Sequence, residues 1–598
     1  MRTADRTHLD YFALVRRARR ATTMSGSPLR VALLGDCALQ QVAPLVRVLL
    51  ADAGFAAEIY EAGYDTVENE AHDPSSGLFA FRPDVVVIVQ ATQRLRDRYY
   101  SFTGSSAELV DDLANKMASV WRAISERTGA PIVQSTFVVP SERAFGNFGF
   151  RAPPSFHTTV QRLNAAIAKL ASETPSIYLH DVDYVASEIG RRQFIDEKLW
   201  LLSKSLCALE HLPEVAQNLV DVVLAIRGVA AKCVVLDLDN TTWGGVVGDD
   251  GIEGIRLGED EDGPAFRGLQ RFAKELSKRG LILAVCSKNT DSVARDAFAR
   301  HPDMVLKLDD IAVFVANWQD KATNIRHIQE TLNIGLDSIV FLDDNPFERN
   351  LVRQILPQVI VPELPEDPAD YVRAVASLNL FETASASALD ADRGRMYADQ
   401  AKREGERAQF TSLEEYLASL DTKVTVGRFD RFNLPRIVQL TQRSNQFNLT
   451  TRRYGEAECE RFMNDQSAYP FHVSVRDKYG DFGLVQVAIV RISGADAVID
   501  QFLMSCRVLM RGVEEFAMNR IFETAKARGC TRVVGTFIPT AKNAMVAEFY
   551  PRFGFAKVDD RIDDSGGTTT WAHDVARWVP RSTHMEVIEA DPTQESAR

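Results

Sequence analysis

The segment KCVVLDLDNTTWGGVVGDDG, residues 232–251, constrains the fold more than any other part of the chain. An apolar run of β-type residues at 234–236 is followed at once by Asp237 and Asp239. Two neighbouring carboxylates raise each other's pKa unless a cation or a shared proton offsets their charge. Magnesium is the expected cation, because it prefers hard oxygen ligands and keeps sites for water and phosphate. The segment predicts a strand that ends in a catalytic site; for this motif alone, an Asp- and Gly-rich surface turn is the alternative.

Three further elements follow in an order that supports the catalytic interpretation. A second apolar strand at 281–286 ends in Ser287–Asn289, where a hydroxyl and backbone N–H groups can hold a phosphate. Lys321 opens a predicted helix and can neutralise phosphoryl charge, and a third strand at 339–342 ends in Asp343–Asn345, which offers more metal ligands. Alternating strands and helices predict a parallel α/β sheet, whose ligands collect at the carboxyl ends of its strands. All four elements are expected to meet there.

These elements resemble the four motifs of the haloacid dehalogenase (HAD) superfamily: Asp237-x-Asp239-x-Thr241, Ser287, Lys321 and Asp343-Asp344. Longer stretches resemble its FkbH-like branch, subfamily HAD-IIIC: Trp243-Gly244-Gly245, Gly248-Asp249-Asp250-Gly251, Cys286-Ser287-Lys288-Asn289 and Asp343-Asp344-Asn345-Pro346. The resemblance implies a Rossmann-like catalytic domain in which Asp237 attacks phosphorus and Asp239 transfers protons. It implies that Ser287 and Lys321 bind phosphate, and that magnesium is held by Asp237, the backbone carbonyl of Asp239, and Asp343 or Asp344.

FkbH-like enzymes are glyceryl transferase/phosphatases. They take D-1,3-bisphosphoglycerate, a small glycolytic phosphate, remove phosphate and load the glyceryl unit as a thioester on a phosphopantetheinylated acyl carrier protein for polyketide-type biosynthesis. The resemblance implies this activity and this partner for the chain. Two alternatives stay open: a magnesium-dependent phosphatase fused to an acyl-CoA-dependent acyltransferase, and a non-catalytic scaffold that docks carrier proteins.

Length and composition set the wider frame. A chain of 598 residues is too long for one core and predicts three or four domains. A net charge of −13 argues against a nucleic-acid partner, and no apolar run reaches the roughly 18 residues of a membrane helix. Because the N-terminus also lacks an apolar signal core, we expect a cytoplasmic protein. The seven cysteines show no CxxC spacing, so neither a disulfide framework nor a zinc site is predicted.

An N-terminal arm is predicted at 1–28, as a basic helix that is either solvated or docked. Residues 29–227 resemble the flavodoxin-type α/β domain of SGNH hydrolases, with Gly35-Asp36-Cys37 where those enzymes carry Gly-Asp-Ser. Such a hydrolase needs Asp-x-x-His, but here Asp196 is followed by Glu197-Lys198-Leu199. Without that base Cys37 stays mostly protonated, so a structural or docking domain is expected unless His180 or His211 serves.

The HAD-like domain is predicted at 228–375, without room for a large cap domain, so a lid must come from elsewhere in the chain. A helical connector is expected at 376–420 and a disordered polar tail at 579–598. Residues 421–578 show an α+β pattern that resembles an N-acetyltransferase (GNAT) domain, with a turn at Arg507–Gly512. Met510 stands where that pattern expects its first glycine, which argues against close pyrophosphate approach.

The acyl step needs a thiol and a surface for the carrier. Cys286 is the first candidate thiol, because it lies beside Ser287 and near Lys288, which would favour thiolate; Cys37 is second and Cys506 third. An acidic carrier calls for basic side chains. The candidates for the carrier or phosphopantetheine side are Arg443, Asn445, Gln446, Asn448, Arg452, Arg453, Arg507, Arg511, Asn543 and Tyr550.

Overall fold

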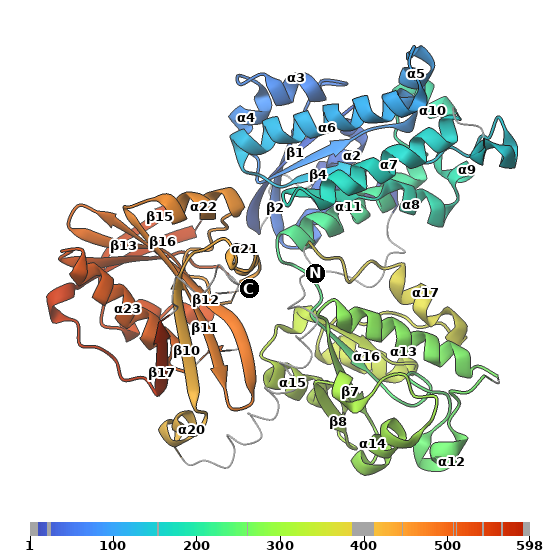
Figure 1. Ribbon diagram of the computed structural model, residues 1–598. Helices are drawn as coiled ribbons and strands as arrows, with labels where there is room; N and C mark the ends of the chain where they lie inside the picture. The colour runs from blue at the N-terminus through green and yellow to red at the C-terminus, as the bar shows by residue number, and fades with distance from the viewer. Residues whose placement is uncertain are drawn as a thin grey trace. The chain divides into compact units, whose positions relative to one another are not determined.

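The computed structural model describes residues 10–20, 26–151, 155–259, 261–384, 412–444, 446–505, 508–509, 511–540, 543–563 and 566–589. Two parallel sheets are followed by a C-terminal region rich in β-structure, which confirms the predicted α/β multidomain class (Figure 1). The described chain divides into two compact units. One runs to Ile226 and includes Glu382–Ala384, and the other begins at Arg227. In the part of the chain described, no helix is long and apolar enough to cross a membrane.

The first unit contains a five-stranded parallel sheet in the order β2-β1-β3-β4-β5. Its strands are β1 (Ser27–Gly35), β2 (Phe55–Glu61), β3 (Val85–Val89), β4 (Ile132–Ser135) and β5 (Ile177–His180). Its helices are α1 (Tyr11–Arg20), α2 (Leu39–Asp52), α3 (Val67–His72), α4 (Gly77–Phe81), α5 (Thr92–Ser101), α6 (Ser106–Thr128), α7 (Phe156–Ser172), α8 (Val182–Ile189), α9 (Arg191–Phe194), α10 (Glu197–Ser203) and α11 (Leu212–Ile226).

Burial on both faces explains the apolar strands of this sheet. All five residues of β3, VVVIV, are buried, as expected where helices cover both sides of a parallel sheet. Helices α6 and α7 pack against β1, β3 and β4 in one hydrophobic cluster. The helix predicted in the basic arm is docked over its described residues: Leu14 and Ala18 of α1 are buried, α1 contacts α2, and Arg17 pairs with Asp52.

The HAD-like region contains a four-stranded parallel sheet in the order β8-β7-β6-β9. Its strands are β6 (Cys233–Leu236), β7 (Ile282–Ser287), β8 (Val313–Ala316) and β9 (Ile339–Leu342). Its helices are α12 (Val247–Gly254), α13 (Gly263–Lys278), α14 (Asp291–Arg300), α15 (Lys321–Leu332), α16 (Pro346–Ile355) and α17 (Tyr371–Ala376). Helices α15 and α16 pack on one face of the sheet in a shared apolar core. The predicted motifs therefore begin where β6, β7 and β9 end.

The C-terminal region contains an eight-stranded mixed sheet in the order β15-β16-β14-β13-β12-β11-β10-β17. Its strands are β10 (Thr422–Arg428), β11 (Ala468–Asp477), β12 (Gly480–Ser493), β13 (Asp496–Met504), β14 (Arg532–Phe537), β15 (Ala556–Asp563), β16 (Gly566–Asp574) and β17 (Met585–Glu589). Its helices are α20 (Leu413–Ser419), α21 (Leu434–Arg443), α22 (Glu456–Asn464), α23 (Val513–Ala527) and α24 (Phe549–Arg552). Helices α23 and α24 pack in one apolar cluster, and α21 and α22 in another.

Two sequence predictions change at the ends of this region. The predicted disordered tail is wrong for Met585–Glu589, because these residues form β17 and pair in parallel with β10. Backbone pairing with the edge strand β10 orders this short segment, whose apolar residues Met585, Val587 and Ile588 lie in an otherwise polar tail. In the predicted connector, Leu413–Ser419 forms α20, and residues 385–411 lie outside the described residues.

Candidate active site

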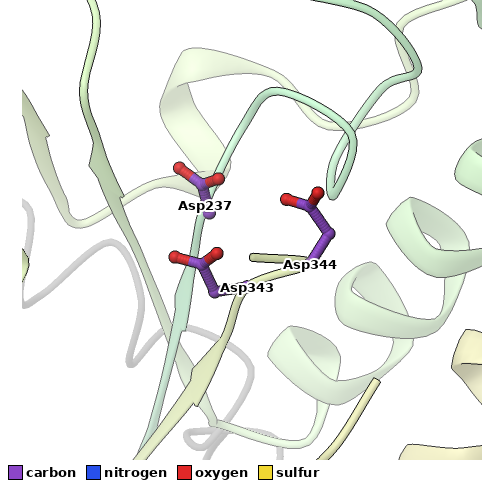
Figure 2. A group of neighbouring side chains, drawn as sticks. All are labelled: Asp237, Asp343 and Asp344. Atoms are coloured by element: carbon purple, nitrogen blue, oxygen red, sulfur yellow. The ribbon is translucent and has the colours of Figure 1, made fainter. Parts of the chain in front are cut away.

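Three carboxylates meet at the carboxyl edge of the HAD-like sheet. Asp237 follows β6, and Asp343 and Asp344 follow the neighbouring strand β9. The backbone N–H of Asp237 donates to the carbonyl of Leu342 at 2.9 Å, which holds the two strand ends together. One carboxylate oxygen of each residue lies within 4.8 Å of the others, and Figure 2 shows the three side chains around a common space. The sequence prediction that these motifs converge is thus realised in the fold.

Lys321 lies against this carboxylate cluster. It is the first residue of α15, whose N-cap Asp320 accepts a hydrogen bond from the backbone of Thr323. Its ammonium nitrogen Nζ lies 2.9 Å from Asp237 Oδ1 and also contacts Asp343 Oδ2. Burial alone would lower the pKa of Lys321, but the two carboxylates outweigh it and the pKa is raised. Lys321 is therefore a fixed positive charge in the cluster.

One ammonium does not offset three carboxylates, of which Asp237 and Asp343 are buried and Asp344 is half-buried. Burial, followed by the charge of Asp237, raises the pKa of both Asp343 and Asp344. A divalent cation would remove this repulsion, and the donors are the hard oxygens that magnesium prefers. The cluster of Asp237, Asp343 and Asp344 therefore fits magnesium. The carboxylate of Asp239 does not belong to this cluster. The ligand predicted from Asp239 is its backbone carbonyl, and that assignment stays a prediction.

Asp239 is held separately by three N–H donors. Its Oδ1 accepts from Trp243 Nε1 at 2.9 Å and from the backbone of Val247 at 3.1 Å, and its Oδ2 accepts from Asn289 Nδ2 at 2.9 Å. Burial raises the pKa of Asp239, although these hydrogen bonds act in the opposite direction. A carboxyl group fixed in position beside Asp237, with a raised pKa, has the properties of a general acid and base.

The remaining phosphate-binding candidate is Ser287, the last residue of β7, which is buried. Its Oγ accepts from Asn289 Nδ2 at 3.2 Å. The next residue, Lys288, turns to Glu348 of α16, with 2.5 Å between Nζ and Oε1. Ser287 and Lys321 thus lie on strand and helix ends that point to one edge of the sheet, as the sequence predicts.

Several residues that support the site were given no role from the sequence. Thr241 exchanges hydrogen bonds with Asp344, accepting from its backbone N–H at 2.9 Å and donating to Oδ1 at 3.2 Å. The buried guanidinium of Arg349 donates to the backbone carbonyls of Asp343 at 2.8 Å and Asp344 at 2.6 Å. Trp243 and Asn289 anchor Asp239. Their sequence positions could have indicated a supporting role, because Thr241, Trp243 and Asn289 all occur inside the motifs that resemble the HAD and FkbH-like patterns.

Between β6 and β7 the described chain contains α12 and α13, and Gly244 and Arg256 form a short antiparallel bridge. This segment is small, as the expected absence of a large cap domain requires. Two large aromatic side chains near the motifs are exposed: Trp318, before Lys321, at 75%, and Phe347, after Asp344, at 69%. They expose apolar surface at positions close in sequence to Lys321 and Asp344.

The structure does not present Cys286 as an accessible thiol. Its side chain belongs to the apolar core formed with α15 and α16, and its thiol donates to the backbone carbonyl of Lys321 at 3.8 Å. Burial strongly raises the pKa of this thiol. The expected thiolate next to Lys288 is therefore wrong. Successive strand residues point to opposite faces, so Cys286 faces the core while the neighbouring Ser287 does not.

The Gly35-Asp36-Cys37 turn of the first unit is also buried. Asp36 Oδ1 accepts from the backbone of Ala91 at 2.7 Å, which ties the end of β1 to the end of β3. Burial raises the pKa of Asp36 to about 7 and raises that of the Cys37 thiol. Asp196 caps α10 by accepting from Leu199 at 2.9 Å. The turn thus has the features of a structural connection, and the expected structural or docking role of the domain stays a prediction.

The two histidines named above as possible bases for Cys37 lie in other environments. His180 ends β5 with no exposed surface, and burial lowers its pKa to about 4. His211 Nδ1 lies 3.3 Å from Glu214 Oε2. Among the interactions of the described residues, neither imidazole is paired with the Cys37 thiol, so neither is placed to act as its base.

Replacing Asp36 by asparagine is expected to change how the stability of the first unit depends on pH. The folded state holds the Asp36 proton more tightly than the unfolded state, whose pKa is the ordinary 3.8. The contribution of Asp36 to stability is therefore largest at low pH and is lost as pH rises toward about 7. Between about pH 5 and pH 8 the loss is up to about 3 kcal/mol. The carboxamide of the variant can still accept from Ala91 without this loss.

The measurement is hydrogen exchange by mass spectrometry on peptides from β1 and β3 in the full chain. The variant and the parent are compared at both pH values, so that other titrating groups cancel. The difference in stability between the variant and the parent should be more favourable to the variant at pH 8 than at pH 5. An equal difference at the two pH values would contradict the buried, protonated state of Asp36.

The carrier-side candidates are largely engaged inside the C-terminal region. The buried Arg511 pairs with Asp477, 3.2 Å between NH1 and Oδ2. Asn543 Nδ2 donates to the carbonyls of Asn448 at 3.0 Å and Ile538 at 2.9 Å. The other described candidates are also bound: Tyr550 is buried with a raised pKa, Arg452 pairs with Asp500, Arg453 donates to Thr441, and Gln446 is half-buried. Asn445, Cys506, Arg507, Met510 and the Arg443 side chain lie outside the described residues.

A sequence family described as FkbH, N-terminal domain, matches residues 30–224. The crystal structure of the N-terminal part of the protein BF1531 from Bacteroides fragilis, containing a phosphatase domain complexed with Mg, is 41% identical to this chain. That similarity covers 62% of this chain and 99% of the other, with a TM-score of 0.59. No curated protein matches the sequence.

The structure of the Escherichia coli ribosomal-protein-S18-alanine N-acetyltransferase is 14% identical, covers 25% of this chain and 94% of its own, and has a TM-score of 0.21. A spermidine N-acetyltransferase from Vibrio cholerae in complex with CoA and spermine is 13% identical over 26% of this chain and 97% of its own, also at 0.21. Similarity at this level does not establish a relationship, so the GNAT-like assignment stays a prediction.

The parallel sheet, with carboxylates, a hydroxyl and an ammonium at its carboxyl edge, defines a HAD-type catalytic domain. The N-terminal family match and the similarity to the BF1531 fragment complete the assignment. The chain belongs to the FkbH-like proteins.

Proposed function

We propose that the chain is a magnesium-dependent HAD-type phosphatase that also transfers a glyceryl group to an acyl carrier protein. The observation that carries the phosphatase part is the cluster of Asp237, Asp343 and Asp344 around Lys321, with Asp239 held beside it. Membership in the FkbH-like proteins supports the transferase part. The phosphorylated substrate is D-1,3-bisphosphoglycerate, and the acceptor is the phosphopantetheine thiol of the carrier.

The phosphatase step begins with in-line attack of an Asp237 carboxylate oxygen on phosphorus, which forms an aspartyl phosphate and breaks the bond to the leaving oxygen. Asp239 gives its proton to that oxygen, then takes a proton from the water that hydrolyses the aspartyl phosphate. Ser287 and Lys321 bind the equatorial oxygens, a contribution of several kcal/mol in a dry site. Asp237, Asp343 and Asp344 would hold magnesium, which would supply positive charge for the phosphoryl oxygens.

The two phosphates of the substrate place different demands on the site. Loss of the ester phosphate at C3 leaves an alkoxide, which needs a proton from an acid such as Asp239. Loss of the acyl phosphate at C1 leaves a carboxylate, which needs no proton. That reaction would also destroy the activated carbonyl that the acyl transfer requires. We infer that the HAD-type site removes the C3 phosphate. The acyl phosphate then acylates a thiol: a C–S bond forms, the C–O bond breaks, and phosphate leaves.

The cysteines favour direct attack by the carrier thiol. All six cysteines in the described chain are buried, including Cys286 and Cys37, and burial raises the pKa of both these thiols. A buried, protonated thiol is a poor nucleophile. Cys506 is the remaining enzyme thiol. The experiment therefore includes Cys506→Ser, which should load the carrier normally if transfer is direct.

The test is intact-protein mass spectrometry of a carrier protein incubated with the full-length enzyme, magnesium and 1,3-bisphosphoglycerate generated in situ. A glyceryl-sized adduct on the phosphopantetheine is expected. With Asp237→Asn the adduct should be absent or should keep its phosphate. Free phosphate without an adduct on any carrier would leave a plain phosphatase, and acylation from acyl-CoA instead would establish the acyltransferase alternative. An unchanged adduct with Asp237→Asn would overturn the assigned role of the HAD-type site.

A further inference from the structure

Asn289 connects the phosphate-binding hydroxyl to the proton-transfer group. It lies in the loop between β7 and α14, and only 4% of its surface is exposed. Its Nδ2 donates to Asp239 Oδ2 at 2.9 Å and to Ser287 Oγ at 3.2 Å. An amide nitrogen carries two hydrogens, so it can make both bonds at once. One buried carboxamide therefore fixes the positions of two groups that act on the same phosphate.

The other two donors on Asp239 act on its second oxygen. Trp243 Nε1 and the backbone N–H of Val247 both donate to Oδ1, at 2.9 and 3.1 Å. Oδ1 therefore has its acceptor positions used, and Oδ2 accepts only the Asn289 bond among the hydrogen bonds of the described residues. A carboxyl oxygen has two lone pairs, so Oδ2 keeps one for a proton. Oδ2 is the oxygen that can exchange a proton with the substrate or with water.

The bond to Ser287 has a matching consequence. Because Ser287 Oγ accepts from Asn289, its own hydroxyl hydrogen is directed elsewhere and can be donated to a phosphoryl oxygen. The same amide then places Asp239 Oδ2 near the leaving oxygen of that phosphoryl group. A misplacement of about 1 Å in such an arrangement can cost about a hundredfold in rate.

We propose that Asn289 is a positioning residue that aligns Asp239 Oδ2 with the leaving oxygen of the phosphate bound at Ser287. The proposal rests on the proposed phosphatase function and adds a residue to it. Asn289 itself transfers no proton and contacts no substrate. Asn289 determines how well Asp239 reaches the leaving oxygen. Replacing Asn289 should therefore slow a reaction more when its leaving group needs a proton.

The leaving group separates this role from a structural one. An alkoxide leaving group requires proton transfer, whereas p-nitrophenolate is stable as an anion and does not. The ratio kcat/KM covers the steps up to leaving-group departure, and kcat also includes hydrolysis of the aspartyl phosphate, where Asp239 activates water. Misalignment of Asp239 should lower kcat/KM for alkyl phosphates. For p-nitrophenyl phosphate it should lower kcat and leave kcat/KM nearly unchanged.

The experiment compares the full-length parent with Asn289→Leu on glycerol 3-phosphate and p-nitrophenyl phosphate at saturating magnesium. We expect kcat/KM to fall at least about tenfold more for the alkyl phosphate than for the aryl phosphate. For p-nitrophenyl phosphate, kcat and KM should fall together. Asn289→Ala repeats the test with a smaller side chain if the leucine variant fails to fold. Ser287→Ala is the matched control, since loss of phosphate binding should lower kcat/KM for both substrates alike.

An equal loss of kcat/KM for both substrates with Asn289→Leu and Asn289→Ala would overturn the proposal and make Asn289 a structural or general phosphate-binding residue. Unchanged kinetics on both substrates would overturn it as well. A parent enzyme that releases no phosphate from either substrate would overturn the proposed phosphatase function itself. The failure of the inference is thus distinct from the failure of the function on which it rests.

Discussion

Replacing Asp237 by asparagine should reduce phosphate release from p-nitrophenyl phosphate by at least about a thousandfold. The change removes the attacking carboxylate and, in the same step, one of the three oxygens that lie within 4.8 Å in the metal-binding cluster. The side chain keeps its shape, so the fold should persist. The measurement is phosphate release at several magnesium concentrations, with circular dichroism to check folding.

Asp249→Asn is the matched control for this variant. It makes the same carboxylate-to-amide change at an exposed residue of α12, close in sequence but outside the cluster. Its rate should stay within about twofold of the parent, because Asp249 is exposed and solvent and salt screen its charge. Residual activity of Asp237→Asn above one tenth of the parent would show that another residue accepts the phosphoryl group.

Replacing Lys321 by methionine should lower kcat by about a hundredfold to a thousandfold, because it removes a fixed positive charge from the phosphoryl site. It should also make stability depend on magnesium. Without Lys321, the buried carboxylates of Asp237 and Asp343 lose their ammonium partner. Breaking such a buried pair costs about 3–5 kcal/mol, which a divalent cation can offset.

Urea unfolding of Lys321→Met with EDTA and with magnesium measures this effect. Magnesium should stabilise the variant by more than it stabilises the parent. The magnesium concentration that gives half of the maximal activity should also be lower for the variant than for the parent. Lys278→Met is the control, since Lys278 pairs with Glu275 on an exposed face of α13. A variant that needs more magnesium than the parent would contradict the view that Lys321 and the metal balance the same carboxylates.

Short-range patterns were sufficient to place the ends of the strands. The apolar run before Asp237 and the run before Asp343 each predict a strand that stops at a polar residue, and β6 and β9 do so. Because neighbouring parallel strands bring their carboxyl ends to one edge, the meeting of these residues followed without any knowledge of pair contacts. The predicted magnesium ligands rest on this same reasoning.

Contacts between distant residues could not be read in the same way. Nothing in the spacing shows that Asn289 reaches Asp239, which lies fifty positions earlier in the chain. Nor does the pattern around Arg511 show that it pairs with Asp477 and is withdrawn from solvent. Charge and residue type set what a side chain can bind, but the fold selects the partner.

Side-chain direction at a strand end was a second limit. Cys286 and Ser287 are neighbours, and sequence proximity suggested that they share an environment. The alternation of a strand sends one into the core with α15 and α16 and leaves the other at the edge. One position along the strand therefore separates a packing residue, Cys286, from a phosphate-binding candidate, Ser287.

The pairing of β17 with β10 bears on the order in which the molecule is assembled. The HAD-like sheet can close once β9 has been synthesised, because all its strands lie within one continuous stretch. The C-terminal sheet joins β10, its first strand, to β17, the last strand described, so its outermost pairing has a long sequence separation. Such pairings form slowly. During synthesis on the ribosome, the edge of β10 that pairs with β17 would stay unpaired until nearly all of the described chain had emerged.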